Sequence, residues 1–335
     1  MATAVSMSPT AGLHVVVHDR RVVADGVIAL ELRAAGGNEL PPFTAGSHID
    51  VELPVKDAHG HAIVRQYSLC NDPSERGRYV IGVGRDPSSR GGSVYLHDEL
   101  RLGDALRVSA PRNHFQLHEA AEHSVLIAGG IGITPLLAMA RRLSALGKRW
   151  RLYYCARTEQ RAAFRDDIRA LPGEVIPVFD GVPGGQPIDL GRVMRETPTD
   201  AHLYCCGPAG LMEAFERAAS NRPGRNVHVE WFKPRLVEPS PMAAEAEGSF
   251  EVKLARTGLT LKVPADKSIL DVLIDADVAV QYSCCDGVCG TCETRVLDGV
   301  PDHRDSVLLG EDAGAADRII LCVSRSASPC LTLDL

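Results

Sequence analysis

The sequence has no excess of basic residues and no long apolar run. Its 36 Lys and Arg residues stand against 43 Asp and Glu residues, for a formal net charge of -7. This balance argues against nucleic acid or an anionic membrane as a partner. The longest uncharged run, Ser124–Ala140, has 17 residues and includes three glycines and a proline. It is slightly short for a membrane span, and a strand, a turn and a helix explain it better.

A secretory start is missing as well. Residues Met1–Gly12 are small and polar, without the basic start and apolar stretch of a secretory signal. We therefore expect a cytoplasmic protein. Hydrophobic residues at 45% and charged residues at 24% exclude a disordered or collagen-like chain. The 335 residues contain no internal repeat and predict two or three domains.

The hydrophobic pattern changes along the chain and divides it into domains. Short strand-like runs separated by turn residues predict an antiparallel β-barrel over residues 1–119. Strand-like and helical segments alternate over 120–235, which predicts a parallel-sheet α/β domain. Residues 236–248 are rich in proline, small residues and acidic residues, which predicts a linker. Residues 249–335 are expected to form a third domain. That last domain carries most of the negative charge, with 8 Lys and Arg against 14 Asp and Glu.

The pattern also predicts individual elements. Barrel strands are expected at Leu13–Val17, Ile28–Leu32, His48–Leu53, Ile63–Leu69, Tyr79–Val83 and Ala105–Val108. In the α/β domain, strands are expected at Ser124–Ala128, Arg151–Cys155, Val175–Phe179, His202–Cys206 and Val227–Phe232. Helices are expected from Leu136 to a stop at Gly147, and at Arg161–Leu171, Ala209–Ser220 and Ile269–Asp275.

Four of the ten cysteines have the spacing of an iron–sulfur site. Cys284, Cys289 and Cys292 form C-x4-C-x2-C, and Cys322 follows after 29 intervening residues. This is the ligand spacing of plant-type [2Fe–2S] proteins. The alternative is a structural zinc site. Zinc sites usually pair two C-x2-C knuckles, and this stretch has only one.

The residues between these cysteines bear on the same prediction. Gly287 and Gly290 let the loop backbone approach a cluster and point N–H groups at sulfur. Cys285 complicates the loop, because it can substitute as a ligand at C-x3-C. Only Cys284 gives the x4 spacing, so we expect Cys284 to be the ligand and Cys285 a non-ligand.

A glycine-rich turn opens the expected α/β domain. Ala128–Pro135, A-G-G-I-G-I-T-P, lies between an expected strand and helix. Glycines there allow a phosphate-bearing ligand to approach the backbone at a helix N-terminus. The strict G-x-G-x-x-G fingerprint is absent because position 135 is proline, and an ordinary tight turn is the alternative.

Two further strand ends favour a dinucleotide. Tyr204–Pro208, Y-C-C-G-P, ends one expected strand, and strand ends of an open α/β sheet face the ligand crevice. We expect Cys206 against a nicotinamide ring and Cys205 in the core. Asp180 follows the strand ending at Phe179, where a carboxylate accepts hydrogen bonds from ribose hydroxyls and repels a 2′-phosphate. This favours NADH over NADPH, and the alternative is a turn-forming Asp before Gly181.

In the expected barrel, Arg65-Gln66-Tyr67-Ser68 offers a phosphate partner, a stacking ring and a hydroxyl. Alone, R-x-Y-S is weak, and an exposed Arg on a strand is the ordinary interpretation. The order R-x-Y-S, G-G-I-G-I-T-P, Y-C-C-G-P and then the cysteines resembles the phthalate dioxygenase reductase family, within the ferredoxin–NADP reductase-like flavoproteins. Further matching strings are Arg65–Asp72, Gly91–Ser93, Asp302–Asp305 and Cys322–Arg325.

The resemblance covers the chain beyond its first ten or so residues. It implies an FMN-binding β-barrel, an NADH-binding α/β domain and a C-terminal β-grasp plant-type ferredoxin domain. FMN rather than FAD rests on the resemblance alone. It implies FMN contacts from Arg65, Gln66, Tyr67, Ser68, Gly91, Gly92, Ser93, Thr134 and Phe232, with core packing the alternative for Phe232. It implies an NADH site shaped by Gly129, Gly130, Gly132, Cys206, Gly207 and Pro208, beside Asp180.

The implied activity is that of an oxygenase reductase. NADH gives a hydride to FMN, and single electrons pass through the [2Fe–2S] cluster to a terminal, Rieske-type aromatic-ring oxygenase. Ser68, Thr134 and Cys206 are expected to position flavin and nicotinamide without acid or base roles. The acidic ferredoxin domain is expected to dock the oxygenase, and the protein to be a monomer. The alternatives are an electron donor to a cytochrome P450 or other monooxygenase, and a zinc-binding or redox-sensing protein.

Overall fold

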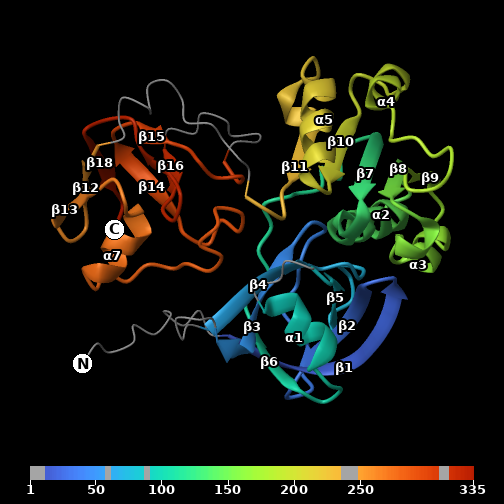
Figure 1. Ribbon diagram of the computed structural model, residues 1–335, viewed down its shortest axis with the longest axis horizontal. Coiled ribbons are helices and arrows are strands. Elements are labelled where there is room, and N and C mark those ends of the chain that lie inside the picture. The colour runs from blue at the N-terminus through green and yellow to red at the C-terminus, as the bar shows by residue number, and fades with distance from the viewer. Residues whose placement is uncertain (1–11, 57–61, 87–90, 235–247, 309–316) are drawn as a thin grey trace. The chain divides into compact units, whose positions relative to one another are not determined.

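The computed structural model describes residues 12–56, 62–86, 91–234, 248–308 and 317–335 (Figure 1). The chain divides into two compact units, one spanning residues 10–232 and one that includes 233–335. The expected linker 236–248 lies outside the described residues except for Gly248. Across the described ranges, no helix is long and apolar enough to cross a membrane.

An antiparallel sheet forms the first half of the larger unit. Its six strands are arranged in the order β4-β3-β6-β1-β2-β5, and a bridge between Leu69 and Ile81 joins the two ends of the sheet. Alternate apolar residues, such as Ile49, Val51 and Leu53 of β3, are buried on its inner face. The elements are β1 Leu13–Ala24, β2 Val27–Ala34, β3 His48–Lys56, β4 Ala62–Ser68, β5 Tyr79–Gly84, α1 Gly92–Asp98 and β6 Ala105–Val108.

A five-stranded parallel sheet in the order β11-β10-β7-β8-β9 forms the second half. Helix α2 packs against one face, where it buries Leu136 and Met139, and α4 and α5 pack against the other. The elements are β7 His123–Gly129, α2 Ile133–Ala145, β8 Arg149–Ala156, α3 Arg165–Arg169, β9 Glu174–Phe179, α4 Leu190–Glu196, β10 His202–Cys206, α5 Ala209–Ala219 and β11 Val227–Glu230.

Local sequence patterns predicted most of these elements, and the elements that differ from prediction do so for local structural reasons. Helix α2 ends as expected at Gly147, whose φ of 66° lets the N–H of Lys148 bond to Leu143 O at 2.9 Å. Helix α3 is shorter than expected because Phe164, at its N-cap, has a left-handed φ of 58° and separates it from the preceding turn. The short helices α1 and α4 were not expected.

The second unit contains a mixed five-stranded sheet in the order β13-β12-β18-β14-β16. Strands β12 and β18 run parallel, and the other pairs are antiparallel. Helix α7 begins at a capping box in which Ser268 and Asp271 bond reciprocally. The elements are β12 Phe250–Leu254, β13 Thr260–Val263, α7 Ile269–Asp275, β14 Glu293–Asp298, β15 Pro301–Asp302, β16 Arg318–Ile320, β17 Arg325–Ser326 and β18 Cys330–Leu333. The predicted fold class is confirmed in all three domains.

Candidate functional site

The R-x-Y-S strand β4 lies against the start of helix α1. The Arg65 side chain passes directly over Gly92, because a Cβ at Gly92 would lie 2.9 Å from Arg65 Cγ and Nε. Gly91, the N-cap of α1, has a φ of 93°, which favours glycine. The Ser93 hydroxyl accepts a hydrogen bond from the N–H of Asp86 at 3.1 Å. A guanidinium, exposed helix N–H groups and a hydroxyl make a donor set that fits a phosphate.

At the end of β4, a hydrogen bond joins the barrel to the parallel sheet. The Ser68 hydroxyl donates to Glu230 Oε2 at 3.4 Å. Glu230 ends β11 and is the register partner of Cys206, which ends β10. The structure therefore brings together Ser68 and Cys206, two residues that the sequence predicted near flavin and nicotinamide, and places Glu230 between them.

Glu230 is a further site residue that the sequence patterns did not single out. Burial raises its pKa to about 8, and the hydrogen bond from Ser68 lowers it only in part. A carboxyl group kept neutral near pH 7 by its surroundings is a candidate functional group. The sequence offered one indication of it, an acidic residue near the end of an expected strand, in the same V-E-W-F string that pointed to Phe232.

The two glycine-containing turns of the α/β domain touch each other. A Cβ on Gly132 would lie 2.2 Å from the Cys206 carbonyl oxygen, and one on Gly129 would lie 2.6 Å from Pro208 Cδ. A Cβ on Gly207 would in turn lie 3.0 Å from Gly129 Cα. Gly130 has a φ of 54°. Gly129, Gly132 and Gly207 are thus required by the close packing of the two turns, and Gly130 is favoured by its positive φ.

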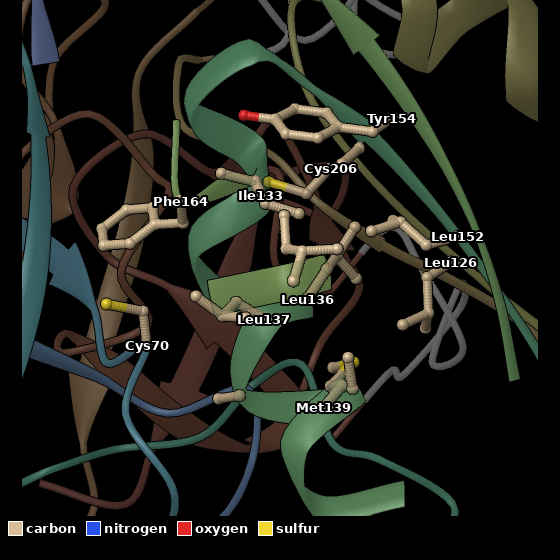
Figure 2. Close-up of a cluster of buried hydrophobic side chains, with 14 of the residues drawn as sticks. Cys70, Leu126, Ile133, Leu136, Leu137, Met139, Leu152, Tyr154, Phe164 and Cys206 are labelled. Atoms are coloured by element: carbon tan, nitrogen blue, oxygen red, sulfur yellow. The ribbon is translucent and has the colours of Figure 1, made fainter. Parts of the chain in front are cut away.

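Thr134 and Cys206 are both buried at this junction. The Thr134 hydroxyl donates to Ile131 O at 3.0 Å, and its methyl group leaves no space for a Cβ at Gly82 of the barrel. Figure 2 shows Cys206 beside Ile133 in the buried cluster around α2. Burial raises the pKa of the Cys206 thiol well above its ordinary value, so the group remains neutral.

The remaining predicted flavin residues have different surroundings. The Gln66 amide donates to Asp50 Oδ1 at 2.9 Å, on the outer face of the sheet. Tyr67 packs at the edge of the barrel core, where burial raises the pKa of its phenol. Phe232 is 38% exposed, which excludes the core packing weighed for it.

Asp180 lies at the carboxyl end of β9, beside a basic residue that the sequence patterns did not single out. Arg157 follows β8, and its Nη1 donates to Asp180 Oδ1 at 3.2 Å. The N–H of Gly181 bonds to the Arg157 carbonyl at 2.8 Å, so the two strand ends are tied by backbone as well. The sequence indicated Arg157 only by its position, as a basic residue just after an expected strand.

In the second unit, the four predicted cysteine ligands converge. The thiol of Cys284 interacts with those of Cys289 and Cys322, and the thiol of Cys292 interacts with that of Cys322. These neighbouring thiols, and after them the backbone N–H groups of Asp286 and Val288, lower the pKa of Cys284 despite its burial. The N–H of Asp286 lies 3.4 Å from the Cys284 sulfur. Such N–H groups stabilise thiolates that bind iron.

The loop backbone adopts the conformation that this convergence requires. Gly287 and Gly290 have φ values of 70° and 68°, and a Cβ on Gly287 would lie 2.6 Å from Val323 Cγ2. Cys285 also has a positive φ, 55°, and is exposed, with its sulfur 3.9 Å from Ser283 O.

The four thiols fit the ligand set of a [2Fe–2S] cluster, which is held by four cysteine thiolates. They also have the plant-type spacing, C-x4-C-x2-C followed by Cys322.

Comparisons with known proteins agree with this division of the chain. Three family models match in order: an oxidoreductase FAD-binding domain at residues 14–117, an oxidoreductase NAD-binding domain at 126–217, and a 2Fe-2S iron-sulfur cluster binding domain at 252–327. Phenoxybenzoate dioxygenase subunit beta of Ectopseudomonas oleovorans is 45% identical over the full length of both chains. The solved structure of a phthalate dioxygenase reductase is 39% identical, covers 97% of this chain and 98% of its own, and has a TM-score of 0.68.

The chain belongs to the phthalate dioxygenase reductase family. It is therefore an oxidoreductase with flavin-binding, NAD-binding and [2Fe–2S] domains, which excludes a zinc-binding or non-enzymatic sensor protein. A self-sufficient cytochrome P450 monooxygenase also matches, at 36% identity and a TM-score of 0.88. The match covers all of this chain and 43% of that protein.

Proposed function

We propose that this reductase binds FMN, takes electrons from NADH and delivers them one at a time to a terminal aromatic-ring oxygenase. The observation that carries the proposal is the presence, in one chain, of the Ser68–Glu230–Cys206 junction and the four converging cysteines. When bound, the flavin and the cluster supply the conversion between a two-electron donor and a one-electron carrier. Relatives named as vanillate O-demethylase oxidoreductase and phthalate dioxygenase reductase support the class of partner.

The residues of this chain bind and orient the groups. Arg65, Gly91, Gly92 and Ser93 would hold the FMN phosphate, and FMN rather than FAD is proposed from the family resemblance. Tyr67 and Phe232 would lie along the flavin ring, with Gln66 holding β4 in register through Asp50.

The nicotinamide would be held where the two turns meet. Gly129, Gly130, Gly132, Gly207 and Pro208 would shape its site, and Ser68, Thr134 and Cys206 would orient it against the flavin. Cysteines 284, 289, 292 and 322 would hold the irons. We further propose that the protein acts as a cytoplasmic monomer.

An anaerobic visible spectrum of the purified protein, before and after NADH, tests this function. Flavin and iron–sulfur bands that both bleach support it. A protein reconstituted with iron, sulfide and flavin that does not respond to NADH would overturn it. Flavin released by denaturation and identified by chromatography should be FMN.

Coenzyme preference is expected to depend on Asp180. In the Asp180→Asn variant, Arg157 loses its anionic partner and becomes able to pair with a 2′-phosphate. We expect the ratio of kcat/KM for NADPH over NADH to rise about tenfold, as a single charge contact typically contributes. The gain should vanish in the Asp180→Asn, Arg157→Gln double variant. If Asp180 only forms the turn before Gly181, the ratio will not change in either variant.

Delivery to the oxygenase is expected to weaken with salt. The domain at 249–335 has 8 Lys and Arg against 14 Asp and Glu, so a basic surface on the partner would be attracted to it. Raising ionic strength from about 0.01 M to about 1 M shortens the Debye length from about 30 Å to about 3 Å. We expect kcat/KM for the oxygenase to fall at least tenfold across this range, while reduction of a neutral quinone remains unchanged. Equal salt dependence of both reactions would contradict docking by charge.

A cytochrome P450 is the second candidate partner. The match to a self-sufficient P450 protein, with a TM-score of 0.88, favours it specifically. Reconstitution of the reductase with a purified oxygenase and with a purified P450, each from the same source as the reductase, distinguishes the two.

A further inference from the structure

One buried acid of the ferredoxin unit has no part in the site described above. Asp305 is 1% exposed. Its Oδ1 accepts hydrogen bonds from the N–H groups of Val307 at 2.9 Å and Leu308 at 2.6 Å. Burial acts to raise the pKa of Asp305, but the hydrogen bonds from His303 and these two N–H groups together lower it. The carboxylate therefore remains ionised inside the unit.

The second carboxylate oxygen reaches the turn that carries the fourth cysteine. The Ser324 hydroxyl donates to Asp305 Oδ2 at 3.1 Å, and Ser324 lies two residues after Cys322. His303 Nδ1 lies 3.5 Å from the same oxygen. The Ser324 hydroxyl also accepts a hydrogen bond from the N–H of Arg304 at 3.2 Å, so it bonds to two neighbouring residues of the Asp305 segment.

The segment around Asp305 also contacts the loop that carries the other three cysteines. The N–H of Ser306 donates to Gly287 O, in the cysteine loop, at 2.9 Å. A Cβ on Gly287 would lie 3.3 Å from Asp305 Cα and 2.6 Å from Val323 Cγ2. Gly287 thus lies between the Asp305 segment and the Cys322 turn, so the Asp305 segment contacts both the 284–292 loop and the turn that carries Cys322.

We propose that Asp305 is a positioning residue of the iron–sulfur centre: its buried carboxylate holds the Cys322 turn against the 284–292 loop and keeps a fixed negative charge beside the cluster. A nearby anion disfavours the addition of an electron, so Asp305 holds the midpoint potential of the cluster low. The inference rests on the proposed assignment of Cys284, Cys289, Cys292 and Cys322 as ligands.

The test is a redox titration of the full-length protein, followed by electron paramagnetic resonance. Asp305→Asn keeps the size and one acceptor oxygen but removes the charge. We expect its midpoint to rise by about 59 mV, which corresponds to a tenfold change in the ratio of reduced to oxidised cluster. We also expect altered g-values. Asp298→Asn, which removes an exposed carboxylate of the same unit, should change neither.

Ser324→Ala separates the two parts of the proposal, because it removes the tie to the Cys322 turn and leaves the charge. We expect it to lose cluster absorbance to an iron chelator several-fold faster than the unchanged protein. If the Asp305→Asn variant fails to hold a cluster, the chelation rate of Ser324→Ala still tests the proposal. Wild-type values of midpoint, g-values and chelation rate in these variants would overturn the inference and leave Asp305 as a turn-former. An unchanged protein without a [2Fe–2S] signal would instead overturn the ligand assignment.

Discussion

Serine in place of Cys284 is expected to abolish electron delivery to one-electron acceptors. The Cys284 thiol interacts with those of both Cys289 and Cys322, so it links the 284–292 loop to the fourth ligand. A hydroxyl is a much weaker ligand for iron in a site built from thiolates. We expect the iron–sulfur absorbance and iron content to fall to background. Cytochrome c reduction by NADH should fall at least 100-fold, while NADH still bleaches the flavin.

The neighbouring cysteine provides the matched control. Cys285 is exposed, with a positive φ, and lies outside the group of four converging thiols. Cys285→Ser should retain the cluster and full cytochrome c activity. The reverse result, a cluster lost in Cys285→Ser and kept in Cys284→Ser, would show that the C-x3-C spacing supplies the ligand.

The cluster loop was predictable from sequence because its determinants are local. Three of its cysteines lie within nine residues, and the glycines between them have the positive φ values that the loop needs. Capping signals are equally local, which is why Gly147 and helix α7 matched expectation. The alternation of strands and helices predicted the parallel sheet by the same reasoning.

The junction between barrel and sheet was predictable only in part. Ser68 and Glu230 are 162 residues apart, and no spacing rule relates them. Their contact depends on how two domains pack. Likewise, the exposure of Phe232 and the pairing of Arg157 with Asp180 depend on strand ends that only the folded sheet brings together. The predicted length of helix α3 was too great, because nothing in the sequence indicates that Phe164 has a left-handed φ.

Glu230→Gln is expected to stabilise the larger unit. The pKa of Glu230 is raised to about 8 in the folded chain, against about 4.3 when unfolded. Between these values the folded chain holds a proton that the unfolded chain has released, so the free energy of unfolding falls as pH rises from about 4.3 to about 8. Glutamine does not titrate, and we expect a gain of about 2–4 kcal/mol at pH 8–9 and little at pH 4.

The stability measurement has a built-in reporter and a control. Trp150 and Trp231 are the chain's two tryptophans, and both are buried in this unit, so their fluorescence follows its unfolding. Glu213→Gln removes an exposed carboxylate of α5 and should leave the pH profile unchanged. Equal profiles for Glu230→Gln and the unchanged protein would mean that Glu230 is solvated and titrates normally.

The same substitution is expected to slow the reduction of flavin by NADH. Positive charge develops on the nicotinamide as the hydride leaves, and a carboxylate between Ser68 and Cys206 stabilises that charge. The rate should therefore rise through about pH 8 in the unchanged protein, as Glu230 ionises. In Glu230→Gln it should be flat and about tenfold lower at pH 9. Because Ser68 and Glu230 are in contact, Ser68→Ala combined with Glu230→Gln should slow the reaction by less than the product of the two single effects. A pH profile unchanged by Glu230→Gln would exclude Glu230 from the nicotinamide site and leave its burial without a functional explanation.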